Sequence, residues 1–234
     1  MDFQKYSSLS LNKSEDVFKK YSLRWKPKRK LNSSVLVLSL SAFIIDFALV
    51  YLNRYIFVEG KVGTAIFFIL FPFVIEFVTI WGIWGIAASF AGISAGLFYV
   101  SRLKPLYALF LSSVYLSPAL ISFVVYRGVL NRFDIDPLRR DLLSSEIDGK
   151  KAKRLHAWIA FLIINDVLLN LIEVVSGLYF LSIIGYFTKD ETVFWFYVWS
   201  FSNFISDIII EPILIKTMTE SLEELGIVNL GWVT

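Results

Sequence analysis

The chain alternates between long apolar blocks and short polar segments. A polar, basic region over residues 1–33 comes first. The apolar blocks that follow cover residues 35–52, 64–100, 105–126, 157–187 and 193–215. About 20 apolar residues of helix cross the hydrocarbon core of a bilayer. The 64–100 block is too long for one span and predicts a helical hairpin, whose turn we expect between Pro72 and Gly85 because Pro72, Gly82 and Gly85 weaken a helix.

Composition favours a membrane protein. Hydrophobic residues make up 56% of the 234 residues, and Phe alone contributes 22. Soluble domains average about 45–50% apolar residues. We therefore predict an all-α polytopic membrane helix bundle and exclude a soluble enzyme and a disordered chain. The chain has no Cys and one His, which excludes disulfides, thiolate metal sites and haem held by two histidines. The scarcity of Gln and Met is typical of a thermophile.

The distribution of basic residues predicts six transmembrane helices with both termini in the cytoplasm. Eighteen Lys and Arg residues then lie inside, in the 1–33 arm, the 127–156 loop and at Lys216, and five lie outside. The positive-inside rule favours this assignment. The predicted organisation is a basic cytoplasmic arm over 1–33, a six-span membrane domain over 34–216 and a cytoplasmic tail over 217–234. We expect a multi-pass protein of the plasma membrane.

Small residues form a stripe in the predicted third span. They repeat at helical spacing and allow a neighbouring helix to approach closely in lipid. Two interpretations are open: tight packing within the bundle, and a docking face for a partner membrane subunit. The residues concerned are Ala87, Ala88, Ala91, Gly92, Ala95 and Gly96.

Every charged side chain inside the predicted spans is acidic, and no Lys or Arg lies in a span interior. A carboxylate at bilayer depth costs at least about 2.5 kcal/mol. We therefore expect these groups to carry a proton or to bind a cation or a cationic ligand. Glu76 is one of these acids, placed near a span end. The predicted binding residues for a small solute, proton or ion are Asp46, Asp166, Asn170, Glu173, Asn203, Asp207 and Glu211.

The polar residues of the last two spans share helix faces. Asp166, Asn170 and Glu173 follow i, i+4, i+7 spacing on one helix face. Ser200, Asn203, Asp207 and Glu211, at i, i+3, i+7, i+11, likewise share one face of the last span. Because the spans are antiparallel, we expect three contacts across them: Glu173 with Asn203, Asn170 with Asp207, and Asp166 with Glu211. These contacts either only join the two helices or line an ion or proton path. Asp46, at similar depth, would complete a three-helix acidic site.

The 127–156 loop carries eight basic and five acidic residues. We expect an amphipathic helix from Pro137 to about Ile147, with Asp136 as N-cap and Pro137 in its first turn. Leu138, Leu142 and Leu143 would then face the bundle or a partner. The loop is either a coupling element or a solvated linker.

Motifs of catalysis are missing from the sequence. It contains no HExxH, GxSxG, P-loop or Gly-rich nucleotide turn, so we predict no catalytic residues and no cofactor. The basic arm is better explained as a topology anchor than as a nucleic-acid-binding segment. The expected partners are therefore the lipid bilayer and a small solute or ion. A partner membrane subunit is a further possibility, if the small-residue stripe is a docking face.

Three short motifs carry a family resemblance. The last span reads Trp199-Ser200-Phe201-Ser202-Asn203, and Pro212-Ile213-Leu214 begins nine residues after Asn203. This is similar to the Trp, Gly-Asp and Pro-Leu-Leu spacing of MASE1, an integral-membrane sensory module, with Asn203 in place of the family's Asp and no Gly before it. The segment from Asn131-Arg132-Phe133 to Arg140-Asp141 resembles that family's Leu-Arg-Arg…Arg-Asp connection. Trp81-Gly82-Ile83-Trp84-Gly85 resembles its Trp-Pro-Pro-x-Gly motif.

The resemblance implies a membrane sensor, although MASE1 proteins usually carry a kinase or cyclase output domain that these residues lack. Six spans with both ends inside also resemble the substrate-binding subunits of energy-coupling-factor transporters. From the buried acids we predict first a transporter or transporter subunit. A MASE1-like sensor comes second, a structural subunit of a larger membrane complex third, and an enzyme last.

Overall fold

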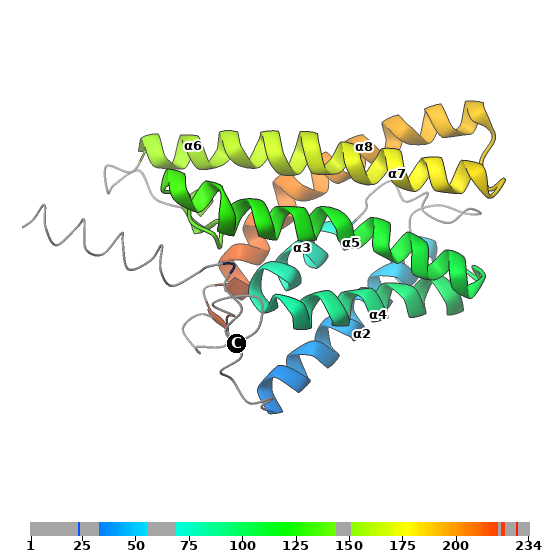
Figure 1. The fold of residues 1–234 in the computed structure, drawn as a ribbon, viewed down its shortest axis with the longest axis horizontal. Coiled ribbons are helices and arrows are strands. Elements are labelled where there is room, and N and C mark those ends of the chain that lie inside the picture. The colour runs from blue at the N-terminus through cyan, green and yellow to red at the C-terminus, as the bar shows by residue number, and fades with distance from the viewer. Residues whose placement is uncertain are drawn as a thin grey trace, which may run out of the picture.

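Every regular element that the structure describes is a helix (Figure 1). The computed structural model describes residues 23, 33–55, 69–143, 151–219, 221–222 and 228. Most of the predicted 1–33 arm and most of the 217–234 tail therefore lie outside the described residues. The main helices are α2 (Ser33–Tyr55), α3 (Leu70–Trp81), α4 (Ile83–Tyr99), α5 (Pro105–Gly128), α6 (Lys151–Phe161), α7 (Asn170–Ile183) and α8 (Lys189–Leu214).

Four short helical segments complete the described chain. Two are 3-10 helices in the 127–156 loop, η1 (Leu130–Phe133) and η2 (Arg140–Leu143). The other two are π-helical: η4 (Leu162–Leu169) joins α6 to α7, and η5 (Ile215–Thr219) continues α8. The segments α6, η4 and α7 run in line as one long rod, and α8 crosses it and descends toward α3 (Figure 1).

Four helical stretches are long and apolar enough to cross a membrane: Val35–Asn53, Pro105–Phe133, Arg154–Ile183 and Lys189–Thr219. Their outward faces are apolar, with Leu36, Leu106, Val167 and Phe201 each more than half exposed. Polar side chains in the interior of these stretches, such as Asp46, Glu173 and Asp207, are in contrast buried. Apolar side chains outside and polar side chains inside are the reverse of the distribution in a soluble protein. Since lipid is apolar, this distribution indicates a helical membrane protein.

The 64–100 block forms two shorter helices joined at Gly82. Helix α3 has 12 residues and α4 has 17, which corresponds to about 18 Å and 25 Å at 1.5 Å per residue. Gly82 adopts φ 54° and ψ −125°, a conformation that favours glycine because it has no Cβ. The predicted turn is confirmed at this residue. Both helices are shorter than a hydrocarbon core of about 30 Å, so six complete spans stay a prediction.

Helix α2 packs against α4 at the small-residue stripe. A Cβ added at Gly92 would lie 2.6 Å from the Phe43 carbonyl oxygen, and one at Gly96 would lie 2.7 Å from the Val50 Cβ. Ala88 is buried on the same side, whereas Ala87 and Ala91 are exposed. Packing within the bundle therefore accounts for the glycines. A partner subunit at the exposed alanines stays a prediction.

We expect Gly92→Val to lower stability by about 1–3 kcal/mol, because the added carbons would push α2 away from α4. The matched control is Ala91→Val, one residue earlier at an exposed position. Thermal unfolding of the detergent-solubilised protein measures both. Equal losses in the two variants would contradict the α2–α4 contact as the cause.

Topology can be tested separately. We expect reporter fusions after Lys30, Ser145 and Thr234 all to report a cytoplasmic location, because 18 of the 23 basic residues then lie inside. An external signal at Ser145 would contradict the six-span arrangement.

Candidate functional site

The interior of the bundle contains a column of polar side chains arranged in three layers. The layers lie along α8 at Glu211, Asp207 and Asn203, which are spaced by about one helical turn. All three side chains are at most 2% exposed. In the direction from the loop end inward, we name them the ionic layer, the carboxylate pair and the amide layer.

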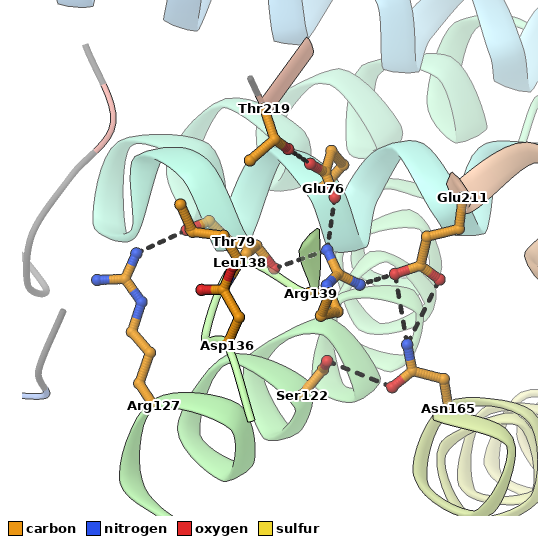
Figure 2. Close-up of polar contacts among 10 residues, drawn as sticks. All are labelled: Glu76, Thr79, Ser122, Arg127, Asp136, Leu138, Arg139, Asn165, Glu211 and Thr219. Atoms are coloured by element: carbon orange, nitrogen blue, oxygen red, sulfur yellow. Dashed lines mark hydrogen bonds and ion pairs between the residues drawn. The ribbon is translucent and has the colours of Figure 1, made fainter. Parts of the chain in front are cut away.

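The ionic layer is centred on Arg139, which comes from the 127–156 loop (Figure 2). Its side chain is 1% exposed, and it forms ion pairs with Glu76 on α3 and Glu211 on α8. The Arg139 Nη2 to Glu76 Oε2 distance is 2.5 Å, and the same nitrogen donates to Thr79 Oγ1 at 3.2 Å. The Thr219 hydroxyl donates to the other oxygen of Glu76. One guanidinium thus joins three separate parts of the fold.

The expectation that all buried acids lack a basic partner is wrong for Glu76 and Glu211. Their partner lies outside the predicted spans, in a loop assigned to the cytoplasm. The signal that could have found it is local: Leu138 immediately precedes Arg139 and has no exposed surface. An apolar residue next to a cation in a polar loop indicates that this part of the loop folds into the bundle. The cation can then pair with acids that lie near the ends of the spans.

The loop does not form the predicted helix from Pro137. Arg139 has φ 62°, which a right-handed helix does not allow. The carboxylate of Asp136 accepts from the Leu138 amide at 3.1 Å and pairs with Arg140 at 2.5 Å. It therefore stabilises a turn instead of capping a helix. The predicted burial of Leu138 and Leu142 is confirmed, and residues 144–147 lie outside the described chain.

Asn165 extends the ionic layer across the bundle. Its Nδ2 donates to both carboxylate oxygens of Glu211 at 3.4 Å, and its Oδ1 accepts from Ser122 on α5 at 3.4 Å (Figure 2). Helical spacing in the sequence does not identify Asn165, because this residue lies outside the i, i+4, i+7 face of Asp166. The π-helix η4 holds more residues per turn than an α-helix, so Asn165 and Asp166 both point inward.

The carboxylate pair consists of Asp166 on η4 and Asp207 on α8. Asp166 is 5% exposed and Asp207 has no exposed surface, which confirms that neither faces lipid. The two carboxyl groups face and interact with each other. Among the described residues, none of their four oxygens has a hydrogen-bond partner of ordinary geometry. The Ser206 hydroxyl and the Asn203 side-chain oxygen are also buried without a partner there.

The amide layer joins the two helices by hydrogen bonds. Asn203 Nδ2 donates to Glu173 Oε2 at 3.0 Å and to Asn170 Oδ1 at 3.1 Å. Asn170 in turn donates to the Ser200 carbonyl oxygen at 2.9 Å. The predicted contact of Glu173 with Asn203 is confirmed.

The other two predicted contacts differ because η4 shifts the register. Asp207 faces Asp166 instead of Asn170. Glu211 is bound by Asn165 instead of Asp166. A π-helical turn holds an additional residue, so the α-helical spacing used for the prediction fails at residues 165–166.

Asp46 lies at a different interface. Its carboxyl is fully buried where α2 meets α4. It faces Ser89, although neither side chain has a hydrogen-bond partner of ordinary geometry within the described residues. The structure therefore does not reproduce the three-helix grouping of Asp46 with Asp166 and Asp207.

A cavity of about 330 Å³ lies between α7 and α8, near their connection. It is lined mainly by apolar side chains such as Leu178, Val193 and Phe196, and none of the buried acids contributes to it. In the described part of the chain, no group of three or more His, Asp or Glu residues is arranged to hold a metal ion.

Comparison with protein families, curated proteins and solved structures gives no match. Function is therefore inferred from the polar column.

Proposed function

We propose that this protein is a membrane transporter, or the solute-binding subunit of one, that binds a proton or a small cation at the carboxylate pair Asp166–Asp207. The supporting observation is that the oxygens of this buried pair lack hydrogen-bond donors and a direct ion pair among the described residues. Two carboxylates so close together cannot both remain ionised at bilayer depth without a proton or a cation between them.

Charge balance supports the same proposal. The described interior contains a second buried guanidinium, that of Arg127 on α5, which donates to the Thr79 carbonyl oxygen at 2.8 Å beside the ionic layer. Within the three layers, acids at positions 76, 166, 173, 207 and 211 accompany the guanidinium of Arg139. This guanidinium is held by Glu76 and Glu211. The remaining negative charge has to be compensated by protons or by a mobile cation, because isolated charges are strongly disfavoured in the membrane.

The two roles expected for the polar side chains of the last two spans, joining the helices and binding an ion or proton, apply to different layers. The amide layer has direct donor–acceptor contacts between α7 and α8, as expected of groups that join helices. The carboxylate pair has acceptors only, since ionised carboxylates cannot donate. Such an oxygen-rich, donor-poor arrangement suits a cation or a transferable proton. Joining two helices would not need it.

The test is proton release from the purified protein in weakly buffered detergent solution. Adding NaCl or KCl to the wild type should release about one proton per chain, because a cation displaces the proton held by the pair. The variant Asp166→Asn/Asp207→Asn should release none. Choline chloride controls for ionic strength. Equal release by both proteins, or no release by the wild type at any pH, would contradict the proposal.

A further inference from the structure

The ionic layer lies between the 127–156 loop and the carboxylate pair. Glu211 lies four residues from Asp207 along α8, about 6 Å at 1.5 Å per residue, and its ion pair with Arg139 places it on the side nearer the loop. Arg139 reaches both: it pairs with Glu211 and interacts electrostatically with Asp207. A cation that approached Asp207 from the loop end along α8 would therefore meet the guanidinium first.

The layer is continuous across the interior (Figure 2). Bonds run from Thr219 through Glu76, Arg139, Glu211 and Asn165 to Ser122. Each of these six side chains is at most 1% exposed. They come from η5, α3, the loop, α8, η4 and α5, so the network spans the bundle from α3 to α5. The guanidinium at its centre holds the network together, because it is bound by carboxylates from α3 and α8 at once.

We propose that Arg139 closes the loop-side route to the carboxylate pair, so that a small cation reaches Asp166 and Asp207 from this side only after Arg139 leaves Glu211. This inference rests on the proposed function, because it assumes that the pair is a binding site. Arg139 is a positioning residue in this role, since it acts by blocking access and does not bind the transported ion. The described segment that carries it, residues 134–143, is the part that has to move.

Access to the site can be measured because the chain contains no Cys. Ser206→Cys places the only thiol beside Asp207, where the native side chain is 1% exposed. A positively charged, membrane-impermeant methanethiosulfonate reagent then reports entry of small cations. Phe133→Cys, at a loop residue that is 71% exposed, identifies the vesicles whose loop side faces the reagent.

The closure is removed without leaving unpaired charges in the variant Arg139→Gln/Glu76→Gln/Glu211→Gln. In loop-side-out vesicles we expect the thiol of Ser206→Cys to react faster in this background by on the order of tenfold or more, since the ion pairs that hold Arg139 against α3 and α8 are gone. Arg139→Lys should react at an intermediate rate, because an ammonium cannot make two directed contacts at once. Arg132→Gln, at an exposed loop arginine, is the matched control and should change nothing.

An unchanged rate in the neutral triple variant would overturn the proposal, and so would equal acceleration by Arg132→Gln. Gel-filtration profiles establish that the compared proteins are folded, and Arg139→Lys supplies the comparison if the triple variant is not. The labelling rate measures access alone. Labelling that depends on Arg139, without proton release, would support the closure and contradict the proposed ion site. Proton release, with labelling that does not depend on Arg139, would support the ion site and contradict the closure.

Discussion

Replacing Arg139 by Met should lower the free energy of unfolding by about 3–5 kcal/mol, the cost of removing one partner from a buried ion pair. Glu76 and Glu211 have no exposed surface, so each would keep an uncompensated charge in a medium that does not solvate it. Arg132→Met is the matched control, because Arg132 is an exposed arginine of the same loop. Denaturation of the solubilised protein measures both variants.

Removing the acids together with Arg139 should restore most of this stability. In Arg139→Met/Glu76→Gln/Glu211→Gln the ionic layer holds no charge, and apolar or neutral replacements of whole ion pairs are commonly tolerated. A single Arg139→Met variant as stable as Arg132→Met would show that the ion pairs contribute nothing to the fold.

Asp207→Asn should abolish cation-dependent proton release while leaving the fold nearly intact. The amide keeps the shape of the carboxyl group and can hydrogen bond, but it neither ionises nor exchanges a proton. Asp46→Asn is the matched control, since Asp46 is equally buried at the α2–α4 interface. It should retain proton release because it lies outside the carboxylate pair.

The apolar variant Asp207→Leu distinguishes the binding role from a purely structural one. If Asp207 only joined helices, Asn would be tolerated in the proton-release assay and Leu would destabilise the bundle. If it binds the ion, both variants lose proton release, whatever the effect of Leu on stability. Loss of release in Asp46→Asn as well would contradict the assignment of the site to Asp166 and Asp207.

Helical periodicity predicted much of this arrangement. The inward faces of Glu173, Asn203 and Asp207 follow from helical spacing, because lipid excludes polar side chains. The break at Gly82 follows from residue type, because glycine interrupts helices. These features depend on neighbours within a few positions of each other. They can therefore be inferred without knowledge of the tertiary structure.

The unpredicted features depend on contacts far apart in the chain or on a change of helix type. Arg139 binds Glu76, which lies 63 residues earlier in the chain, and no local sequence pattern specifies that the two residues pair. Asn165 turns inward because η4 is π-helical, whereas a spacing of 3.6 residues assigns it to another face. Asp46 shares the depth and chemistry of the other acids, but the close approach of α2 to Gly92 places it elsewhere.

The π-helical segment η4 also makes the number of residues in the α6–η4–α7 rod important for the proposed closure. A one-residue deletion within residues 167–169 of η4 would allow an ordinary α-helix and rotate everything upstream, Asn165 included, by about 100° relative to α7, since each α-helical residue turns by that angle. Asn165 would then leave Glu211 while the amide layer stayed in place. The rotation of the helix upstream of the deletion site relative to α7 thus decides whether Asn165 can bind Glu211. Such a deletion would break this contact without changing the chemistry of either side chain.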